Sequence, residues 1–560
     1  MKKSFKVLAI SLIAALSVTA CSSNSTTNTN NSNTQTTDNT AVSTTVDPFA
    51  KYDEPVVVSL GRSIDPTYKY EGTDTAEDNL YTRWLKDAYN IVIKHEWEAS
   101  SSDYGQKVSL AIGSNDLPDT MLVDETQLRL MVKADQLADL TEVYEKFGTD
   151  RLKQIYDSNP GLLEGVTFDG KLYALPETTL PSAPLTWIRK DWLDKLNLPE
   201  PKSLEDLEKI AKSFVDNKMG GENTIGIVGT QQGGSLYSTF LSSGDHYLNF
   251  SSVFFAKDAY PGIWITDKDG NAQYGSTTQE TKDALSTLSG WYANGILDKE
   301  IGLRKSTQEL ISSGQTGIFF GPWWSAYNLT DAINNDPDAN WRPYATPLND
   351  EGKFNSNQAT GSSYIVVKKS YKHPDAIIKM MNIHVNEKQE SYKTAVGKEL
   401  TSQEIPLFLI MGHGDQLEYA VKTTQKVLSG EMPLEDVDRL NYGFTYELAS
   451  HVKNVKTEPF DNYDIQYWDQ KTDADFFTHL YAHLNGGSTF VDADINWVKS
   501  LATAQTKTMQ TKWSNLKKLE DEAFLKIIMG SAPIEEFDTF VEKWKQQGGD
   551  QITEEVNELK

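Results

Sequence analysis

The spacing of hydrophobic residues between positions 55 and 123 changes repeatedly from strand-like to helix-like. The first stretch, 55–60, begins with Pro55, is rich in β-branched residues and is followed by Gly61, as is typical of a buried parallel strand. Thr75 and Asp78 form a capping signal ahead of the first helical stretch. The predicted order is strand, helix, strand, helix, strand at residues 55–60, 80–88, 90–97, 104–112 and 120–123. This alternation predicts an α/β domain with a parallel sheet.

A second alternation of strand and helix patterns begins at residue 185. Ser203 and Asp206 are spaced to cap a helix that runs to about residue 217, and Asp269-Gly270 predicts a hairpin within 264–274. Further strands are predicted at 185–188, 225–228, 316–320 and 364–367, and further helices at 191–196 and 280–293. From residue 376 onward most of the pattern is helical. The chain is therefore expected to form two α/β lobes and a helical C-terminal third.

The N-terminus has the layout of a secretory signal. Lysines precede an apolar run of 14 residues, 7–20, which is too short to cross a bilayer at about 20 residues per span. Residues 18–21 resemble a bacterial lipobox, and Cys21 is the only cysteine in the chain. We predict a signal peptide at 1–20 and a lipidated Cys21 that anchors the protein to the extracellular face of the cell membrane. A plain secretory signal with a chance cysteine is the alternative.

The residues that follow Cys21 indicate a tether. From 22 to 45 all but four residues are Ser, Thr or Asn, so this stretch cannot bury enough apolar surface to offset the entropy cost of ordering it. We predict a disordered tether at residues 21–50. The function is therefore expected to lie in the residues beyond it.

Composition narrows the function of the remaining chain. The formal net charge is −26, which disfavours nucleic acid or an anionic membrane face as a partner. The 13 tryptophans exceed ordinary usage, and a surplus of flat apolar side chains favours a ligand such as a sugar ring. The length permits two or more lobes.

Several segments of the sequence resemble those of one protein family. They lie at residues 111–119, 170–176, 187–199 and 313–324, and they resemble extracellular solute-binding proteins of carbohydrate ABC importers. The Gly-Pro-Trp turn that ends in Trp323 resembles that of maltose-binding protein, and residues 527–530 with 548–549 resemble the long subgroup that binds alginate or rhamnogalacturonide. Together these segments cover most of the chain from about residue 55, and they occur in the same order as in the family.

This resemblance implies a two-lobe periplasmic-binding-protein-like fold with a hinge and a helical C-terminal part. Lobe 1 would comprise 51–180 plus 364–395, and lobe 2 would comprise 181–363 plus 396–560, with crossings near 180, 362 and 395. A solute that contacts both lobes only when the hinge is closed shifts an open-to-closed equilibrium, and a membrane permease would recognise the closed form. The family usually works as a monomer.

The candidate ligand contacts are aromatic and charged side chains, and each has a structural alternative. Trp323 and Trp324 would stack on sugar rings, unless they are core residues. Arg62, Asp65 and Asp124 follow predicted strands at the sheet edge where α/β folds place ligands, or they are solvated loop charges. The remaining candidates are Glu177 at the first crossing, Trp187 near the hinge and Trp264 in the hairpin, while Trp291 is assigned to the core.

Two possible metal motifs are weak. His479 and His483 have helical spacing but lack the glutamate of the zinc-protease motif and a third ligand. Relatives with an acidic loop after the 203–217 helix bind calcium through Asp and Asn at alternating positions, but here Met219 stands where an oxygen ligand is expected. We predict no cofactor and no metal site; calcium is left open, with Met219 arguing against it.

The leading hypothesis is a lipoprotein that captures an oligosaccharide and delivers it to an ABC permease without acting as an enzyme. A peptide-binding or sensor protein of the same fold is the alternative. A surface glycoside hydrolase is a further alternative, because carboxylates and tryptophan in a cleft also suit that enzyme class, but no paired-carboxylate signature is present.

Overall fold

A computed structural model describes most of the chain beyond residue 46. The described residues are 47–65, 68–100, 103–159, 161–178, 181–229, 236–237, 247–304, 307–357, 363–385, 400, 402–439, 442–455, 474–502 and 505–558. The chain divides into residues 1–46 and a compact unit, 47–560. The predicted signal peptide, Cys21 and nearly all of the predicted tether lie outside the described residues. None of the described helices is long and apolar enough to cross a membrane.

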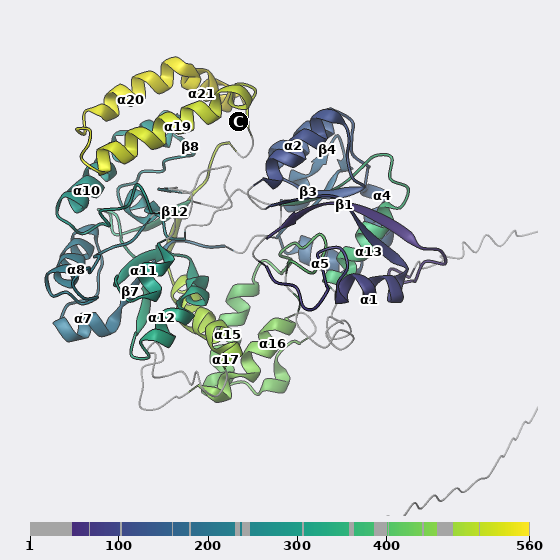
Figure 1. The fold of residues 1–560 in the computed structure, drawn as a ribbon, viewed down its shortest axis with the longest axis horizontal. Coiled ribbons are helices and arrows are strands. Elements are labelled where there is room, and N and C mark those ends of the chain that lie inside the picture. The colour runs from purple at the N-terminus through teal and green to yellow at the C-terminus, as the bar shows by residue number, and fades with distance from the viewer. Residues whose placement is uncertain are drawn as a thin grey trace, which may run out of the picture. The chain divides into compact units, whose positions relative to one another are not determined.

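A five-stranded sheet forms the centre of the first lobe, with the strand order β2-β1-β3-β13-β6 (Figure 1). Its strands are β1 (Val56–Ile64), β2 (Ile91–Ser100), β3 (Thr120–Val123), β6 (Ala174–Pro176) and β13 (Tyr364–Val367). Strands β2, β1 and β3 are parallel, as predicted, whereas β13 runs antiparallel to both β3 and β6. The strand returning near residue 364 therefore completes this sheet rather than the second one.

Short helices and one small hairpin pack around this sheet. They are α1 (Leu80–Tyr89), α2 (Tyr104–Ser114), α3 (Glu125–Lys133), α4 (Thr141–Phe147), α5 (Asp150–Asp157), α6 (Leu162–Gly165) and α13 (Pro374–His384), with β4 (Thr167–Phe168) and β5 (Lys171–Leu172). The cap of α1 is Asn79, not the predicted Thr75. Asn79 and Thr82 bond reciprocally to each other's backbone N–H groups, whereas Thr75 accepts from the Asp78 N–H in the turn before the helix.

The second lobe contains a three-stranded antiparallel sheet of order β10-β7-β11. These strands are β7 (Leu185–Arg189), β10 (Ile318–Gly321) and β11 (Trp341–Tyr344). The strand predicted at 225–228 makes only isolated bridges, at Ile225, Ile227 and Val228. The predicted hairpin is confirmed, with β8 (Trp264–Thr266) antiparallel to β9 (Ala272–Tyr274).

The helices of the second lobe are α7 (Lys190–Leu196), α8 (Leu204–Asp216), α9 (Ser251–Phe255), α10 (Gln279–Ala293), α11 (Gln308–Ser312) and α12 (Thr330–Asn335), with 3₁₀ turns η1 (Gly275–Thr277) and η2 (Trp323–Leu329). Three of them, α7, α8 and α10, lie where they were predicted, whereas the short helices α9, α11 and α12 were not predicted. The predicted cap of α8 is confirmed, because Ser203 and Asp206 form a reciprocal capping box.

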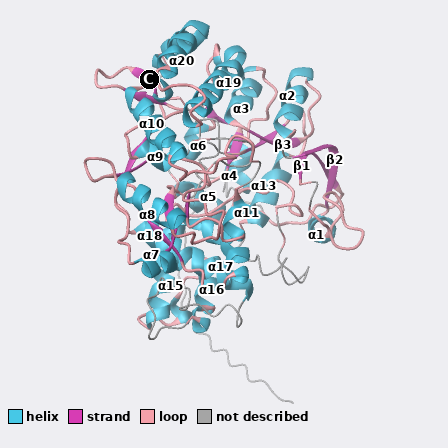
Figure 2. Cartoon of the chain, turned by 60° about the vertical axis from the view of Figure 1, so that its left-hand side comes forward, coloured by secondary structure: helices cyan, strands magenta, loops and turns pink. Residues whose placement is uncertain are grey.

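The C-terminal third forms two groups of helices (Figures 1 and 2). The first holds α15 (Gln416–Ser429), η3 (Leu434–Asp436), α16 (Gly443–Ser450), η4 (Val452–Asn454), α17 (Ala474–Tyr481), the π-helix η6 (Ala482–Gly487) and α18 (Ser488–Val491). The second, α19 (Met509–Ile528), α20 (Glu536–Trp544), the π-helix η7 (Lys545–Gly549) and α21 (Asp550–Asn557), packs beside α10 and β9. One strand, β14 (Ile495–Val498), lies between the groups and pairs in parallel with β12 (Phe354–Asn357), although the pattern predicted helices there.

The cores show where the chain passes between the lobes. The first core lies around the five-stranded sheet and includes Ile405, Leu407 and Leu409. The other two cores lie around the three-stranded sheet and the C-terminal helices. Since residues 405–409 pack on the first lobe, a crossing lies near residue 414. The assignment of 405–409 to lobe 2 is therefore corrected, while the predicted crossing at 395 lies outside the described residues and stays a prediction.

Candidate functional site

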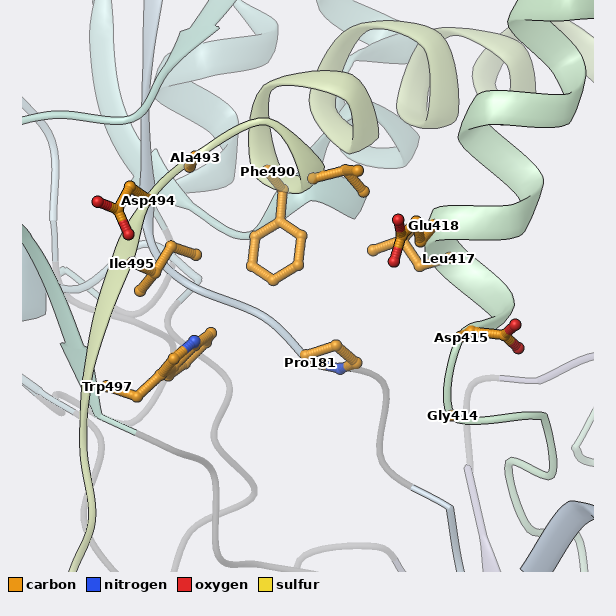
Figure 3. A pocket seen from close by; sticks show the side chains of 11 residues that line it. Pro181, Gly414, Asp415, Leu417, Glu418, Phe490, Ala493, Asp494, Ile495 and Trp497 are labelled. Atoms are coloured by element: carbon orange, nitrogen blue, oxygen red, sulfur yellow. The ribbon is translucent and has the colours of Figure 1, made fainter. Parts of the chain in front are cut away.

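A cavity of about 400 Å³ opens where two of the crossing segments meet the C-terminal helices. Its described lining residues come from three parts of the chain, which lie at the first crossing, around the start of α15, and from α18 into β14. They are Pro181, Gly414, Asp415, Leu417, Glu418, Phe490, Val491, Ala493, Asp494, Ile495 and Trp497 (Figure 3). The volume falls within the range of small-molecule sites.

The cavity adjoins the hinge region. Pro181 stands between β6 of the first sheet and β7 of the second. Gly414 donates its N–H to Ser158 Oγ, 3.2 Å away, at the end of α5 in the first lobe. A Cβ on Gly414 would lie 2.4 Å from the Ser158 carbonyl oxygen, so the close approach requires glycine. A change in the angle between the lobes would therefore reshape this cavity.

Aromatic and aliphatic side chains form the middle of the cavity. The Trp497 side chain is 37% exposed, which is unusual for a large apolar residue. Its ring centroid lies 6.4 Å from that of Phe490, with an interplanar angle of 65°. Figure 3 shows both rings toward the middle of the space, with Pro181 and Ile495 beside them. An open indole face of this kind can pack against the C–H groups of a pyranose.

Three carboxylates, those of Asp415, Glu418 and Asp494, also line the cavity. Asp415 accepts a hydrogen bond of 2.8 Å from the Tyr442 hydroxyl, and burial followed by this hydrogen bond raises the Tyr442 pKa. Glu418 forms an ion pair with Lys422 one helical turn along α15. None of the described lining residues is Lys, Arg or His. The site therefore offers acceptors and flat apolar surface.

A second hollow lies between α10 and the loop after α19 and has different chemistry. Its described lining residues are Ser286, Ser289, Gly290, Ala293, Gly530, Ser531, Ala532, Pro533 and Ile534. Apart from Pro533 and Ile534 these side chains are small, and none is charged or aromatic. The hollow therefore lacks the convergent polar groups and ring faces that a sugar site needs.

Two predicted ligand tryptophans lie in the core. Trp187 is fully buried, stacks on Phe319 with parallel rings 6.0 Å apart, and donates its indole N–H to the Gly321 carbonyl. Trp264 is fully buried in the C-terminal aromatic cluster. Neither presents a face to solvent in this structure. The assignment of Trp291 to the core is confirmed, since it is 1% exposed.

The Gly-Pro-Trp turn begins η2. Trp323 is 4% exposed and packs edge-on against His483, with ring centroids 5.0 Å apart. Trp324 is partly buried against Tyr247 at 5.6 Å. Stacking of Trp323 on a sugar thus requires its ring to move, and both ligand assignments stay predictions.

The charged residues that follow strands of the first sheet have structural partners. Arg62 is 6% exposed and donates to the carbonyl oxygens of Ser402 and Gln403 at 2.6 and 3.1 Å, and its burial lowers its pKa. Asp65 donates its N–H to the Gln403 side chain. Asp124 caps α3 through a 2.8 Å bond from the Gln127 N–H, and desolvation raises its pKa. Their ligand roles stay predictions.

Glu177 connects three segments of the chain. Its carboxylate accepts from the Ile410 N–H at 3.0 Å and from the Ser363 N–H at 3.4 Å, and its own N–H donates to the Ser363 carbonyl oxygen at 2.9 Å. The adjacent Thr178 donates to the Ile410 carbonyl from both its N–H and its hydroxyl. Burial raises the Glu177 pKa. The carboxylate predicted to bind sugar hydroxyls thus already holds the three crossing segments together, and its ligand role stays a prediction.

Among the described residues, no group of three or more His, Cys, Asp or Glu is arranged so that it could hold a metal ion, and neither metal motif forms one. His483 Nδ1 lies 2.8 Å from the His479 carbonyl oxygen, and burial lowers the His483 pKa to about 4. In the 216–223 loop, Asp216 pairs with Lys212 and Glu222 with Lys218 at 2.6 Å each. Both loop carboxylates are therefore already occupied by ammonium groups.

Comparison with known proteins identifies the family. A model of the bacterial extracellular solute-binding protein matches residues 70–389. The chain belongs to this family. The sequence-based recognition of a carbohydrate solute-binding protein is confirmed, and so is the two-lobe α/β fold.

The relatives of this solute-binding protein are distant but similar over most of its length. It is 24% identical over 420 residues to the polygalacturonan/rhamnogalacturonan-binding protein YtcQ of Bacillus subtilis strain 168, covering 70% of this chain and 71% of that one. It is 22% identical over 480 residues to Lipoprotein LipO of the same organism, covering 83% and 86%. The solved structure of alginate-binding protein AlgQ2 without calcium matches with a TM-score of 0.60 at 15% identity, covering 92% of this chain and 99% of that one.

Sequence reasoning missed the exposed aromatic side chain of this solute-binding protein. Trp497 lies in a four-residue strand inside a stretch assigned to helices. The alternation Ile495-Asn496-Trp497-Val498 was the available signal, but it is too short to separate a strand from a helical turn. Pairing with β12 from a distant part of the chain is what makes it a strand.

Proposed function

We propose that this protein captures an oligosaccharide between its lobes and that the cavity beside the hinge is part of the binding site. The observation that carries the proposal is the exposed Trp497 in a cavity next to two crossing segments. Membership of the solute-binding family and the similarity to a protein described as binding polygalacturonan or rhamnogalacturonan support a sugar as the ligand.

The geometry suggests how capture would work. Ring faces supply apolar contact to the sugar C–H groups, and carboxylates near the edge are available to accept hydrogen bonds from its hydroxyl groups. Because Gly414 is bound to Ser158 of the first lobe, lobe closure would bring both lobes to the ligand. A ligand that contacts both lobes stabilises the closed form by its extra contacts there. No covalent step is needed, and the protein acts as a binder rather than an enzyme.

Isothermal titration calorimetry of the chain from residue 47 with a panel of oligosaccharides tests the proposal. We expect saturable binding with a dissociation constant near 1 μM, about −8 kcal/mol, and no change in the sugar afterwards. Trp497→Ala should weaken binding at least about tenfold, or about 1.4 kcal/mol, because it removes the open ring face.

Leu303→Ala is the matched control, since Leu303 is 84% exposed and is not among the described residues that line the cavity. Its affinity for the sugar should equal that of the parent chain. If the parent chain and Trp497→Ala bind the sugar with equal affinity, the cavity is not part of the binding site. A shortened sugar product would instead point to a hydrolase.

We further propose that the captured sugar is delivered to an ABC permease and that acylated Cys21 holds the protein at the outer face of the membrane. The lipobox-like residues 18–21 and the similarity to a lipoprotein support the anchor. In the expressing bacterium, the full-length chain should sediment with membranes, and Cys21→Ala should release it into the soluble fraction, because no acyl chain can then be attached. Mass spectrometry of the N-terminal peptide provides the second measurement: an unmodified Cys21 in the parent chain would contradict the anchor.

A further inference from the structure

The charges of the cavity point to the class of sugar that it accepts. Asp415, Glu418 and Asp494 contribute three carboxylates, and the described lining includes no basic side chain. Among the described lining residues, a carboxylate on a bound sugar would therefore meet like charges and no basic side chain. Recognition of uronates normally relies on Arg or Lys, whose guanidinium or ammonium groups form charge-assisted hydrogen bonds with the carboxylate.

Neighbouring groups compensate these charges only in part. Lys422 pairs with Glu418, and both side chains are more than half exposed. Asp415 receives the neutral hydroxyl of Tyr442, which supplies a hydrogen bond but no positive charge. Within the described part of the chain, neither Asp415 nor Asp494 has an ion-pair partner. Asp415 and Asp494 thus have no directly paired cation among the described residues, although His413, which contacts Arg151, interacts electrostatically with Asp415.

The arrangement of the side chains fits a neutral ring. Figure 3 shows the rings of Phe490 and Trp497 toward the middle of the cavity, while the carboxylates of Asp415 and Asp494 stand at its edges and point away from its centre. A neutral pyranose on the aromatic centre would contact the ring faces through its C–H groups and would carry no charge toward these carboxylates. A uronate in that position would place its carboxylate within the Debye length of about 10 Å at 0.1 M salt, so repulsion would act on it.

We infer that the site takes neutral oligosaccharides in preference to uronic ones. This inference rests on the proposed function and deepens it. It separates the chain from relatives whose names refer to polygalacturonan and alginate, since every sugar of those polymers carries a carboxylate. The net charge of −26 acts in the same direction at long range, because it lowers the local concentration of anionic ligands.

The test compares sugars that differ only in charge. The chain from residue 47 is titrated with neutral fructo-, malto-, galacto- and chito-oligosaccharides, with oligogalacturonates and oligoalginates, and with the carboxyl-reduced form of each acid. At low salt, each reduced form should bind at least about tenfold more tightly than its acid. Raising the salt to about 0.5 M should reduce the difference in affinity between each acid and its reduced form, because like-charge repulsion is screened.

Variants connect the preference to the named residues. The double variant Asp415→Asn/Asp494→Asn should raise the affinity for the acids relative to their reduced forms, because it removes both negative charges. Asp492→Asn is the matched control. It removes one exposed carboxylate two residues from Asp494 without changing a described lining residue. The ratio of the affinities for each acid and its reduced form should therefore change much less.

The possible results separate the two proposals. Tight binding of neutral or reduced sugars with weak binding of acids supports both. Acids that bind as tightly as their reduced forms, or more tightly, overturn the preference for neutral sugars and leave oligosaccharide capture standing. An absence of binding across the entire panel overturns capture and the preference together.

Discussion

Replacing Trp264 with alanine is expected to lower the free energy of unfolding by about 3–5 kcal/mol. The side chain is fully buried, and its ring centroid lies 4.4 Å from Tyr274, 5.4 Å from Trp513 and 6.4 Å from Trp544. Its indole N–H also donates to Thr553 Oγ1 at 3.1 Å. Because these partners lie on β9, α19, α20 and α21, the cavity left by alanine would loosen the C-terminal helices from the second lobe.

Urea unfolding followed by far-UV circular dichroism measures this effect. Trp264→Phe should lose less stability than Trp264→Ala, because phenylalanine keeps the ring contacts. It loses only the hydrogen bond to Thr553 and part of the ring volume. Trp497→Ala is the matched control, because the same substitution at a partly exposed site should change stability by no more than about 1 kcal/mol. Similar midpoints for Trp264→Ala and Trp497→Ala would show that the aromatic cluster is not what attaches these helices.

This contrast also shows what the sequence could and could not predict about the site. Trp187, Trp264 and Trp497 have the same chemistry, and each stands in a short strand-like stretch. Their exposure depends on which distant segments cover them: α19 to α21 cover Trp264, while Trp497 stays open beside the hinge. A local pattern holds no information on such contacts, so it offered Trp187 and Trp264, which lie in the core, as ligand contacts and left Trp497 out.

The fold was more predictable, because its elements depend on local spacing. The β-branched run at 56–58 and the Ser203–Asp206 capping box determined β1 and α8 from neighbours a few residues away. Predictions failed where the outcome depended on long-range pairing. The stretch 225–228 forms only single bridges to residues near 297 and 317, and residues 405–409 join the first core from 38 to 42 residues beyond the end of β13 at Val367.

Glu177 illustrates the same limit at a charged residue. Its position after β6 correctly placed it at the first crossing, but the sequence could not show that Ser363 and Ile410 would direct their N–H groups to its carboxylate. Those donors lie 186 and 233 residues away. A carboxylate at a hinge and a carboxylate in a sugar site need the same kind of donors, so only the fold distinguishes them.

Gly486 controls the position of the Gly-Pro-Trp turn. It is buried in the π-helix η6, and a Cβ there would lie 2.0 Å from the Trp323 carbonyl oxygen and 3.1 Å from the Trp187 ring. Because the clash at 2.0 Å would be with a backbone atom, rotating a side chain cannot relieve it. The absence of a side chain at Gly486 therefore allows η6 to pack directly on the start of η2, and π-helical turns often occur at functional sites.

Gly486→Ala should lower the free energy of unfolding by at least about 1–3 kcal/mol, because the added methyl group forces η6 away from Trp323. Near-UV circular dichroism should change as well, since the environment of Trp323 and Trp187 is disturbed. Gly290→Ala is the matched control. Gly290 lies inside α10 with open space at its Cβ position, so alanine should raise stability by about 0.5–1 kcal/mol through helix propensity. A Gly486→Ala protein as stable as the parent would mean that η2 and η6 separate without cost, and that the turn is held by other contacts.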